Sequence, residues 1–392
     1  MLLLIESDVY ALILRLFDKE STEDEVEVFN VFARFRFDET DVTRESDFLS
    51  FHEKTTLFEE IWEEGWFIYS ITHRYIYLVK ISPIEDDFFE GSISIDECSN
   101  ISNYLFHNAE KLARIQIDNF QRVTNTIPPL RSKVILLHSV PCSGTTVIGK
   151  LLQACDSSKL SLLVIGEPPF LTSLSLAFNY SSIEEMRRLC RSTMKFSLMH
   201  QKTNQTIVLK ARSSCTKIVP FIHAELSSIQ HLFISRKNSN DAISRLVTHV
   251  STSFPFLSQI CKYNDYCRNL IDSFSSWRDL EKEMMIKLNP QTDVEFATAR
   301  VYGSLINFRR NSRYFVAQLP YIEDLIYDTA VAIRPILEIC EISNLTIPDI
   351  IEWKRNEEKT LSDASDFAQL SDENVERVKC LVEIIKQDLF MF

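Results

Sequence analysis

The sequence predicts an α/β protein: a three-layer domain with a central parallel sheet, preceded by an acidic α+β region. Three observations lead to this prediction. Short apolar runs alternate with helical stretches from residue 133 onward, which is typical of a parallel sheet covered by helices on both faces. A Ser/Gly/Thr-rich turn follows the first of these runs. Acidic residues are concentrated in the first third of the chain.

The chain of 392 residues is too long for one ordinary core. We therefore expect an acidic N-terminal α+β region of unknown role over residues 1–130 and a larger domain over residues 131–392. Hydrophobic residues make up 45% and charged residues 25% of the chain, as in folded soluble proteins. No stretch reaches the ~18 apolar residues of a membrane span, so we expect no membrane-spanning segment.

The net charge of −13 is unevenly distributed. Residues 1–130 hold 26 acidic and 11 basic residues, whereas the remainder holds 29 and 31. The acidity of residues 1–130 argues against nucleic acid as a partner. We expect this region to contact a protein partner instead. The nine cysteines form no CxxC pair, so neither a disulfide framework nor a zinc site is indicated. Glu6 and Asp8 interrupt the apolar start of the chain, whereas a signal peptide has a basic flank and an uninterrupted apolar run. We therefore expect a cytoplasmic protein.

In the N-terminal region, residues 66–71 and 75–81 are β-rich runs that predict a hairpin. Residues 102–123 have the periodicity of a helix, which TNTIPP at 124–129 would end. The acidic clusters at 20–27 and 85–90 are interpreted as solvated loops.

In the second region, five apolar runs predict the strands of the parallel sheet: 134–137, 160–165, 206–209, 231–235 and 314–319. Helical stretches are expected at 144–155, 183–199, 215–227 and 239–250, with a long helical region from about 256 to 310. In such a sheet, ligands bind at the carboxyl ends of the strands.

The turn after the first strand of this sheet has the composition of a loop that binds an anion. It runs from Pro141 through Cys142, Ser143, Gly144, Thr145 and Thr146 into an apolar helical pattern. The first turn of a helix offers unpaired backbone N–H groups and a positive dipole end to a phosphate or sulfate. His138, just before the turn, is interpreted as a packed strand residue.

Two registers of a nucleotide-triphosphate loop, GxxxxGK[ST], compete here. Gly144 to Lys150 spells GxxxxGK, but Leu151 replaces the metal-binding hydroxyl residue, and the match begins well after the strand ends. The register from Ser139 starts correctly but has Thr145 in place of the lysine. A P-loop kinase or NTPase is therefore the weakest alternative, and no metal is expected.

The turn resembles the 5′-phosphosulfate loop of the sulfotransferase family, P-[KR]-[ST]-G-[ST]-[ST]. HLFISRKNSNDAISRL resembles the family's 3′-phosphate site, with Arg236 after a strand and Ser244 on the following helix. A third segment, with Tyr321, Glu323, Asp324 and Leu325, resembles the Tyr-Glu-Asp-Leu end of a strand in the family, where its role is structural rather than chemical. Together they cover roughly residues 133–345. The resemblance implies a P-loop-type fold and 3′-phosphoadenosine 5′-phosphosulfate as the co-substrate, without a metal.

The resemblance also implies roles for single residues. Residues 142–146 would bind the 5′-phosphosulfate, and Arg236 with Ser244 the 3′-phosphate. Glu167 stands where the Golgi-type branches, including tyrosylprotein sulfotransferases, have a general base; a helix N-terminal carboxylate is the alternative interpretation. Lys210 would be the remaining cation. Arg212 occupies the place of the cytosolic branch's catalytic histidine, so the Golgi-type branches are the closer match, with a small-molecule or protein hydroxyl as acceptor.

Cys142 departs from the family, which has lysine or arginine there. Losing one group that stabilises developing charge costs ~10²–10³ in rate, whereas the backbone donors of the loop would remain. Two hypotheses follow: a sulfotransferase, or a catalytically impaired nucleotide-binding or interaction protein with the same fold.

Overall fold

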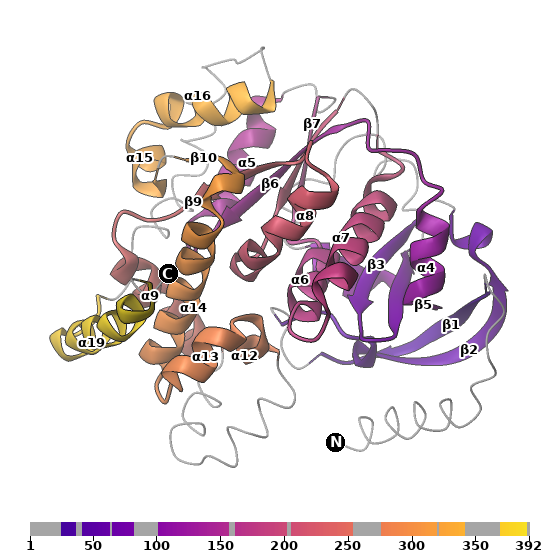
Figure 1. Cartoon of the computed structure of the whole chain (residues 1–392), viewed down its shortest axis with the longest axis horizontal. Coiled ribbons are helices and arrows are strands. Elements are labelled where there is room, and N and C mark those ends of the chain that lie inside the picture. Colours follow the sequence, from indigo (N-terminus) through magenta and orange to yellow (C-terminus); the bar gives the residue numbers. More distant parts are fainter. Residues whose placement is uncertain are drawn as a thin grey trace.

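The computed structural model describes residues 25–36, 41–62, 65–81, 101–156, 161–201, 205–253, 276–319, 321–341 and 369–389. Two five-stranded sheets follow one another along the chain (Figure 1). The predicted acidic cluster at 85–90, residues 20–24 of the other cluster, and residues 256–275 of the predicted long helical region lie outside the described residues.

The first sheet is antiparallel, in the order β2-β1-β5-β4-β3. Its strands are β1 (Glu25–Arg34), β2 (Phe48–Leu57), β3 (Trp66–Ile71), β4 (Tyr75–Ile81) and β5 (Ala109–Gln116). The predicted hairpin is confirmed, because β3 and β4 pair directly. Residues 25–27, predicted as part of a loop, belong instead to β1, which pairs with two strands.

The predicted helix over residues 102–123 is wrong in its middle. Helix α3 (Ile101–Asn108) and helix α4 (Ile117–Thr124) flank strand β5. That strand lies at the centre of the sheet, paired with β1 on one side and β4 on the other. Pairing on both edges outweighs the helical propensity of the segment.

The second sheet is parallel, in the order β10-β9-β6-β8-β7. It contains β6 (Lys133–Ser139), β7 (Leu162–Gly166), β8 (Thr206–Lys210), β9 (Gln230–Ile234) and β10 (Phe315–Gln318), so all five predicted strands are confirmed. β6 lies between β8 and β9: the chain passes from β6 to β7 on one side of it and later crosses from β8 to β9 on the other. The carboxyl end of β6 is therefore the switch point where ligands bind in such sheets.

Helices cover both faces of this sheet, which makes three layers. Alternate residues of β6 face opposite sides: Ile135 and Leu137 pack against one group of helices, Val134 and Leu136 against the other. The first group is α5 (Thr145–Cys155), α15 (Ile322–Tyr327) and α16 (Thr329–Cys340). The second contains α6 (Pro169–Ala177), α7 (Ile183–Leu198), the 3-10 helix η3 (Ser213–Ile218) and α8 (Val219–Glu225). Figure 1 shows α6 and α7 between the two sheets.

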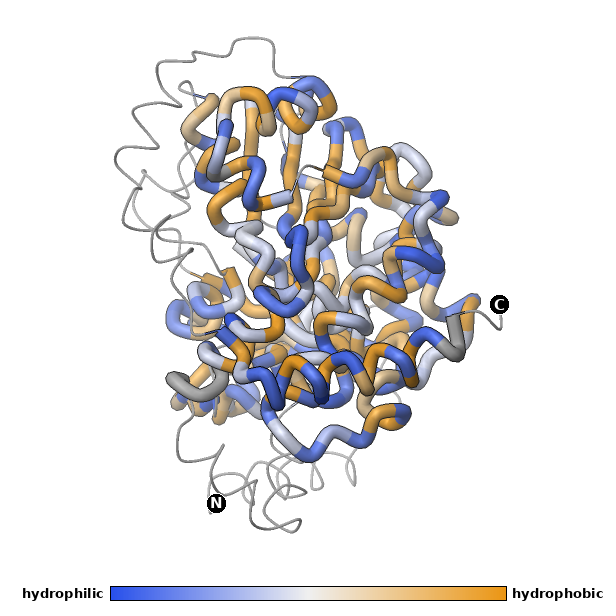
Figure 2. Tube along the Cα trace, turned by 90° about the vertical axis from the view of Figure 1, so that its left-hand side faces the viewer, coloured by the Kyte–Doolittle hydropathy of each residue, from blue (hydrophilic) through white to orange (hydrophobic). Residues whose placement is uncertain are grey.

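The remaining helices follow β9 along the chain. They are α9 (Ser239–Ser253), α12 (Trp277–Leu280), α13 (Lys282–Leu288), α14 (Asp293–Arg310) and α19 (Asp372–Leu389). Figure 2 shows hydrophilic and hydrophobic residues alternating along α19; its Val378 and Ile385 are buried. Within the described ranges, no helix combines the length and apolar character needed to cross a membrane.

A candidate anion-binding site

The loop between β6 and α5 is held in one conformation by its own backbone. Gly144 caps α5 with φ 73°, in the left-handed region. A Cβ added there would lie 2.6 Å from Cδ1 of Ile322, so a larger residue would strain the backbone and displace Ile322. Cys142 also has a positive φ, 58°. The Ser143 hydroxyl donates to the Val140 carbonyl at 2.7 Å, which closes the turn.

The loop presents donors to an anion. In the described part of the chain, no acceptor is found for the backbone N–H groups of Gly144, Thr145 and Thr146. They belong to the cap and first turn of α5, where intrahelical partners are lacking and the dipole is positive. These residues therefore fit a phosphate or sulfate group by their backbone alone.

Two cations reach the loop from the strands on either side of β6. Lys210, the last residue of β8, donates from Nζ to the Thr146 hydroxyl at 2.8 Å. Arg236, just after β9, donates from Nε to the Cys142 carbonyl at 2.8 Å. Both residues are buried. Parallel strands end at one edge of the sheet, so these residues from distant parts of the sequence meet there.

Glu167 is held between two cations. It follows β7 with φ 50°, and its carboxylate lies 3.2 Å from Nζ of Lys210 and 3.0 Å from Nε of Arg212. Burial disfavours ionisation of this carboxyl, but the charges and hydrogen bonds of Lys210 and Arg212 outweigh it and lower its pKa to about 2. Glu167 is thus an ionised carboxylate at neutral pH, engaged on both oxygens.

Cys142 is a neutral thiol. Burial raises its pKa, although the nearby charges of Arg300, Arg236 and Arg245 act in the opposite direction. The thiol therefore stays protonated at neutral pH and does not repel an anion, as a thiolate would. The same three arginines place positive charge around the position that carries no cation of its own.

Arg236 has a second partner. Its Nη1 lies 3.1 Å from Oε1 of Glu323, and the backbone N–H of Lys237 donates to the other carboxylate oxygen at 3.2 Å. Ser244 is buried on α9. A phosphate that approached Arg236 would compete with Glu323 for this guanidinium.

The loop, Lys210 and Arg236, all expected from the sequence at strand ends, lie together in the structure. The GxxxxGK register does not describe the loop, because Lys150 lies in the second turn of α5. Arg300, on α14, was missed, since nothing in the local sequence links it to the loop. Within the described ranges, no group of three potential metal-ligating side chains gathers.

No family model and no curated protein matches this sequence. Among solved structures, the chain is similar to the sulfotransferase domain from the curacin biosynthetic pathway (12% identity, 57% of this chain and 77% of that one, TM-score 0.32). It is also similar to a sulfotransferase from Mycobacterium avium (12%, 69% and 79%, TM-score 0.37). A third is a sulfotransferase from Alicyclobacillus acidocaldarius (10%, 64% and 96%, TM-score 0.34). At such identities, none of these similarities assigns a substrate or an activity to this chain.

Proposed function

We propose that this chain is a sulfotransferase-like protein that binds 3′-phosphoadenosine 5′-phosphosulfate and transfers its sulfuryl group to a hydroxyl acceptor. One observation carries the proposal: Lys210 and Arg236, from the strands on both sides of β6, contact the same loop. That loop offers unpaired N–H donors at a helix start. Cations and backbone donors around one small volume are the groups that recognise a phosphosulfate.

The residues divide between the two ends of the co-substrate. Residues 142–146, with Lys210, would hold the 5′-phosphosulfate. Arg236 and Ser244 would hold the 3′-phosphate, with a forked set of donors and a hydroxyl. The co-substrate supplies the sulfuryl group, and the chain supplies positive charge and orientation. The acidic N-terminal region would contact a protein partner.

Glu167 would take the proton of the acceptor hydroxyl. A carboxylate with a pKa of about 2 is a weak base, because proton transfer is most efficient when the pKa lies near the working pH. However, its low pKa depends on Lys210 and Arg212, which are the cations that an anionic ligand would attract. Binding of the ligand and basicity of Glu167 are therefore coupled.

A second candidate function is nucleotide binding without turnover. Two observations favour it: the neutral thiol of Cys142 at the family's cation position and the engagement of both Glu167 oxygens. The arginines near Cys142 support the binding of an anion equally under both functions, so turnover must be tested separately from binding.

Calorimetry tests the ligand class. We expect the full chain to bind 3′-phosphoadenosine 5′-phosphate and not ATP with Mg²⁺, because the site pairs a phosphate loop with a second cation centre and gathers no metal ligands among its described residues. Arg236→Ala should abolish this binding, whereas Arg187→Ala should leave it unchanged, since Arg187 pairs with Glu225 away from the loop. Binding of ATP alone, or full affinity in Arg236→Ala, contradicts the proposal.

Cys142→Lys tests turnover. If the missing loop cation limits the natural protein, this variant should gain sulfuryl transfer by roughly 10²–10³-fold, measured with labelled co-substrate and a panel of phenols and tyrosine peptides. Cys142→Ser, which adds no charge, is the control. Nucleotide binding without transfer in all three proteins would favour the second candidate function.

A further inference from the structure

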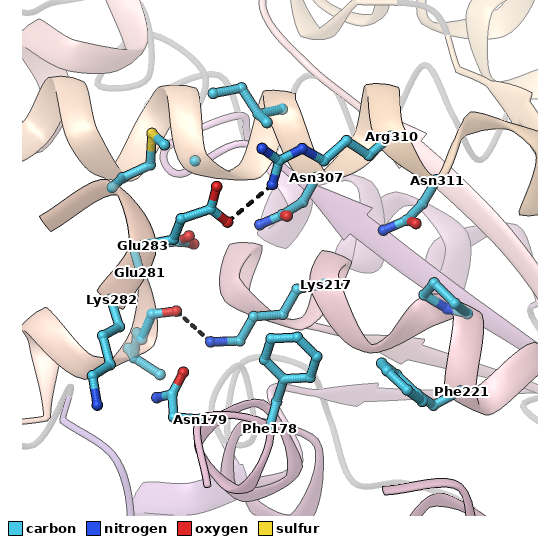
Figure 3. Close-up of a pocket in the computed structure, with 15 residues that line it drawn as sticks. Phe178, Asn179, Lys217, Phe221, Glu281, Lys282, Glu283, Asn307, Arg310 and Asn311 are labelled. Carbon is cyan, nitrogen blue, oxygen red and sulfur yellow. Dashed lines mark hydrogen bonds and ion pairs between the residues drawn. The ribbon is translucent and has the colours of Figure 1, made fainter. Parts of the chain in front are cut away.

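A cavity that the loop residues do not line lies against α13 and α14. It has a volume of about 270 Å³ and is lined by residues of η3, α8, α12, α13 and α14, and by Phe178 and Asn179, which follow α6 (Figure 3). None of Cys142, Glu167, Lys210, Arg236 and Ser244 lines it. A cavity of about 150 Å³ accommodates benzene, so this one has room for a benzene-sized body with a polar group.

Glu281 is the unusual residue of this cavity. It is only 4% exposed, and its Oε1 has no hydrogen-bond partner among the described residues. Its other oxygen faces Gly303 of α14, where an added Cβ would lie 2.6 Å from Oε2. A buried carboxylate oxygen without a donor is costly, and it is the atom that a ligand would satisfy.

Lys217 provides the opposite charge in the same cavity. Its ammonium donates to the Leu280 carbonyl at 2.8 Å and lies 5.6 Å from the ring centre of Phe178 (Figure 3). An ammonium has three N–H donors, and the carbonyl accounts for one. Burial raises the pKa of Glu281 to about 7, against the opposing charges of Lys217 and Arg300, and burial lowers the pKa of Lys217.

The walls of the cavity are largely apolar. Phe178 and Phe221 lie with their ring centres 5.7 Å apart, and Met284 and Ile306 add apolar side chains from α13 and α14. Outside them, Glu283 and Arg310 form an exposed ion pair at 2.9 Å. The charges of Glu283 and Arg310 balance each other, and Lys282 adds a further cation to the lining, whereas Oε1 of Glu281 has no hydrogen-bond partner among the described residues.

We propose that this cavity binds a neutral molecule with a hydroxyl group on a small apolar body, and that the hydroxyl donates to Glu281. A hydroxyl can donate to the carboxylate and accept from Lys217 at once. An ammonium ligand is attracted by Glu281 but repelled by Lys217, and a carboxylate ligand is attracted by Lys217 but repelled by Glu281, so neither ion gains enough from the pair to offset the loss of its hydration. The two residues therefore select against both kinds of ion.

Three probes with one ring test the selectivity: benzyl alcohol, benzylamine and benzoate, titrated against the full chain at about pH 8 and followed by ligand-observed NMR. Benzyl alcohol should bind at least tenfold more tightly than either ion, since a hydrogen bond to a charged group contributes at least this factor. Absence of saturable binding of benzyl alcohol, or equal or tighter binding of either ion, overturns the proposal.

Variants locate the site. Glu281→Met removes both acceptor oxygens at similar volume and should weaken benzyl alcohol binding at least tenfold. The matched control Glu283→Gln changes a rim carboxylate and should alter affinity less than twofold. Should Glu281→Met fail to fold, Gly303→Ala displaces the Glu281 carboxylate instead and should weaken binding in the same direction. Wild-type affinity in the folded variant would show that the hydroxyl does not bind Glu281.

Discussion

Glu167 offsets the positive charges of two residues in the candidate site. Its carboxylate neutralises the positive charges of Lys210 and Arg212 at about 3 Å, and these charges would attract an anion. Glu167→Gln keeps the shape and removes the charge. We expect this variant to bind 3′-phosphoadenosine 5′-phosphate roughly tenfold more tightly, because a one-charge change in a partly buried site is worth about 1–2 kcal/mol. Calorimetry on the two proteins measures the difference.

Glu225→Gln is the matched control, because Glu225 also lies between two cations, Arg187 and Arg191, but away from the loop. Its affinity for the nucleotide should equal that of the unmodified chain. Weaker binding in Glu167→Gln would instead mean that the carboxylate orients Lys210 and Arg212 toward the ligand.

At the residue scale, the residues that meet at the loop are those whose pattern is local in the chain. Cys142 to Thr146 are consecutive, and Lys210 and Arg236 each end a recognisable apolar strand, so their meeting at one sheet edge follows from topology. Arg300 could not be found this way. It reaches the surroundings of Cys142 from the middle of α14, and a helical arginine has no local signal that distinguishes it from a surface residue.

At the element scale, β5 shows why a strand can be mistaken for a helix. Its sequence AEKLARIQ consists of strong helix formers except for Ile115. By contrast, the inner strands of the parallel sheet, β6, β8 and β9, are short apolar runs, because they are buried on both faces. Propensity favoured a helix for β5, but its pairing with β1 and β4, which the sequence of β5 itself does not reveal, determines the outcome.

The position of Ile115 within this sheet gives a test by substitution. Ile115 is 1% exposed in β5, so Ile115→Ala should lower the free energy of unfolding by about 2–5 kcal/mol through lost burial and the cavity left behind. Ile286→Ala is the same change at a residue that is 72% exposed, and it should cost less than about 0.5 kcal/mol beyond propensity. Urea unfolding curves compare the two; equal losses would contradict the placement of β5.

At the scale of the whole molecule, the two sheets share one core. Ile76 and Ile115 from the antiparallel sheet belong to the same buried cluster as Leu136 and Leu209 from the parallel sheet. A polar contact also joins the N-terminal region to the rest of the chain: Arg44 donates to the Ser276 hydroxyl at 2.6 Å. The division of the chain near residue 130 stays a prediction, and this core means that the acidic region supports the fold of the site.

Two buried histidines make the stability of this molecule sensitive to acid. His138 on β6 and His231 on β9 lie 3.2 Å apart between Nε2 and Nδ1, and both are fully buried. Burial, with the neighbouring His231, lowers the pKa of His138 well below its ordinary 6.5, and burial with His223 lowers that of His231 to about 3. The folded chain thus keeps both rings neutral at pH values at which the unfolded chain protonates them.

The unfolded state therefore binds more protons below pH 6.5, so stability is fully present above this pH and declines as the pH falls, by up to about 1.4 kcal/mol per pH unit for each histidine. His138→Leu removes one of these protons. Between about pH 7 and about pH 5, its loss of unfolding free energy should be about 2 kcal/mol smaller than that of the unmodified chain. Comparing variants cancels the other titrating groups, and His52→Leu, at an exposed position, should show an unmodified pH dependence. If His138→Leu and the unmodified chain decline in parallel, His138 is already protonated in the folded state, and the buried pair does not set the acid limit.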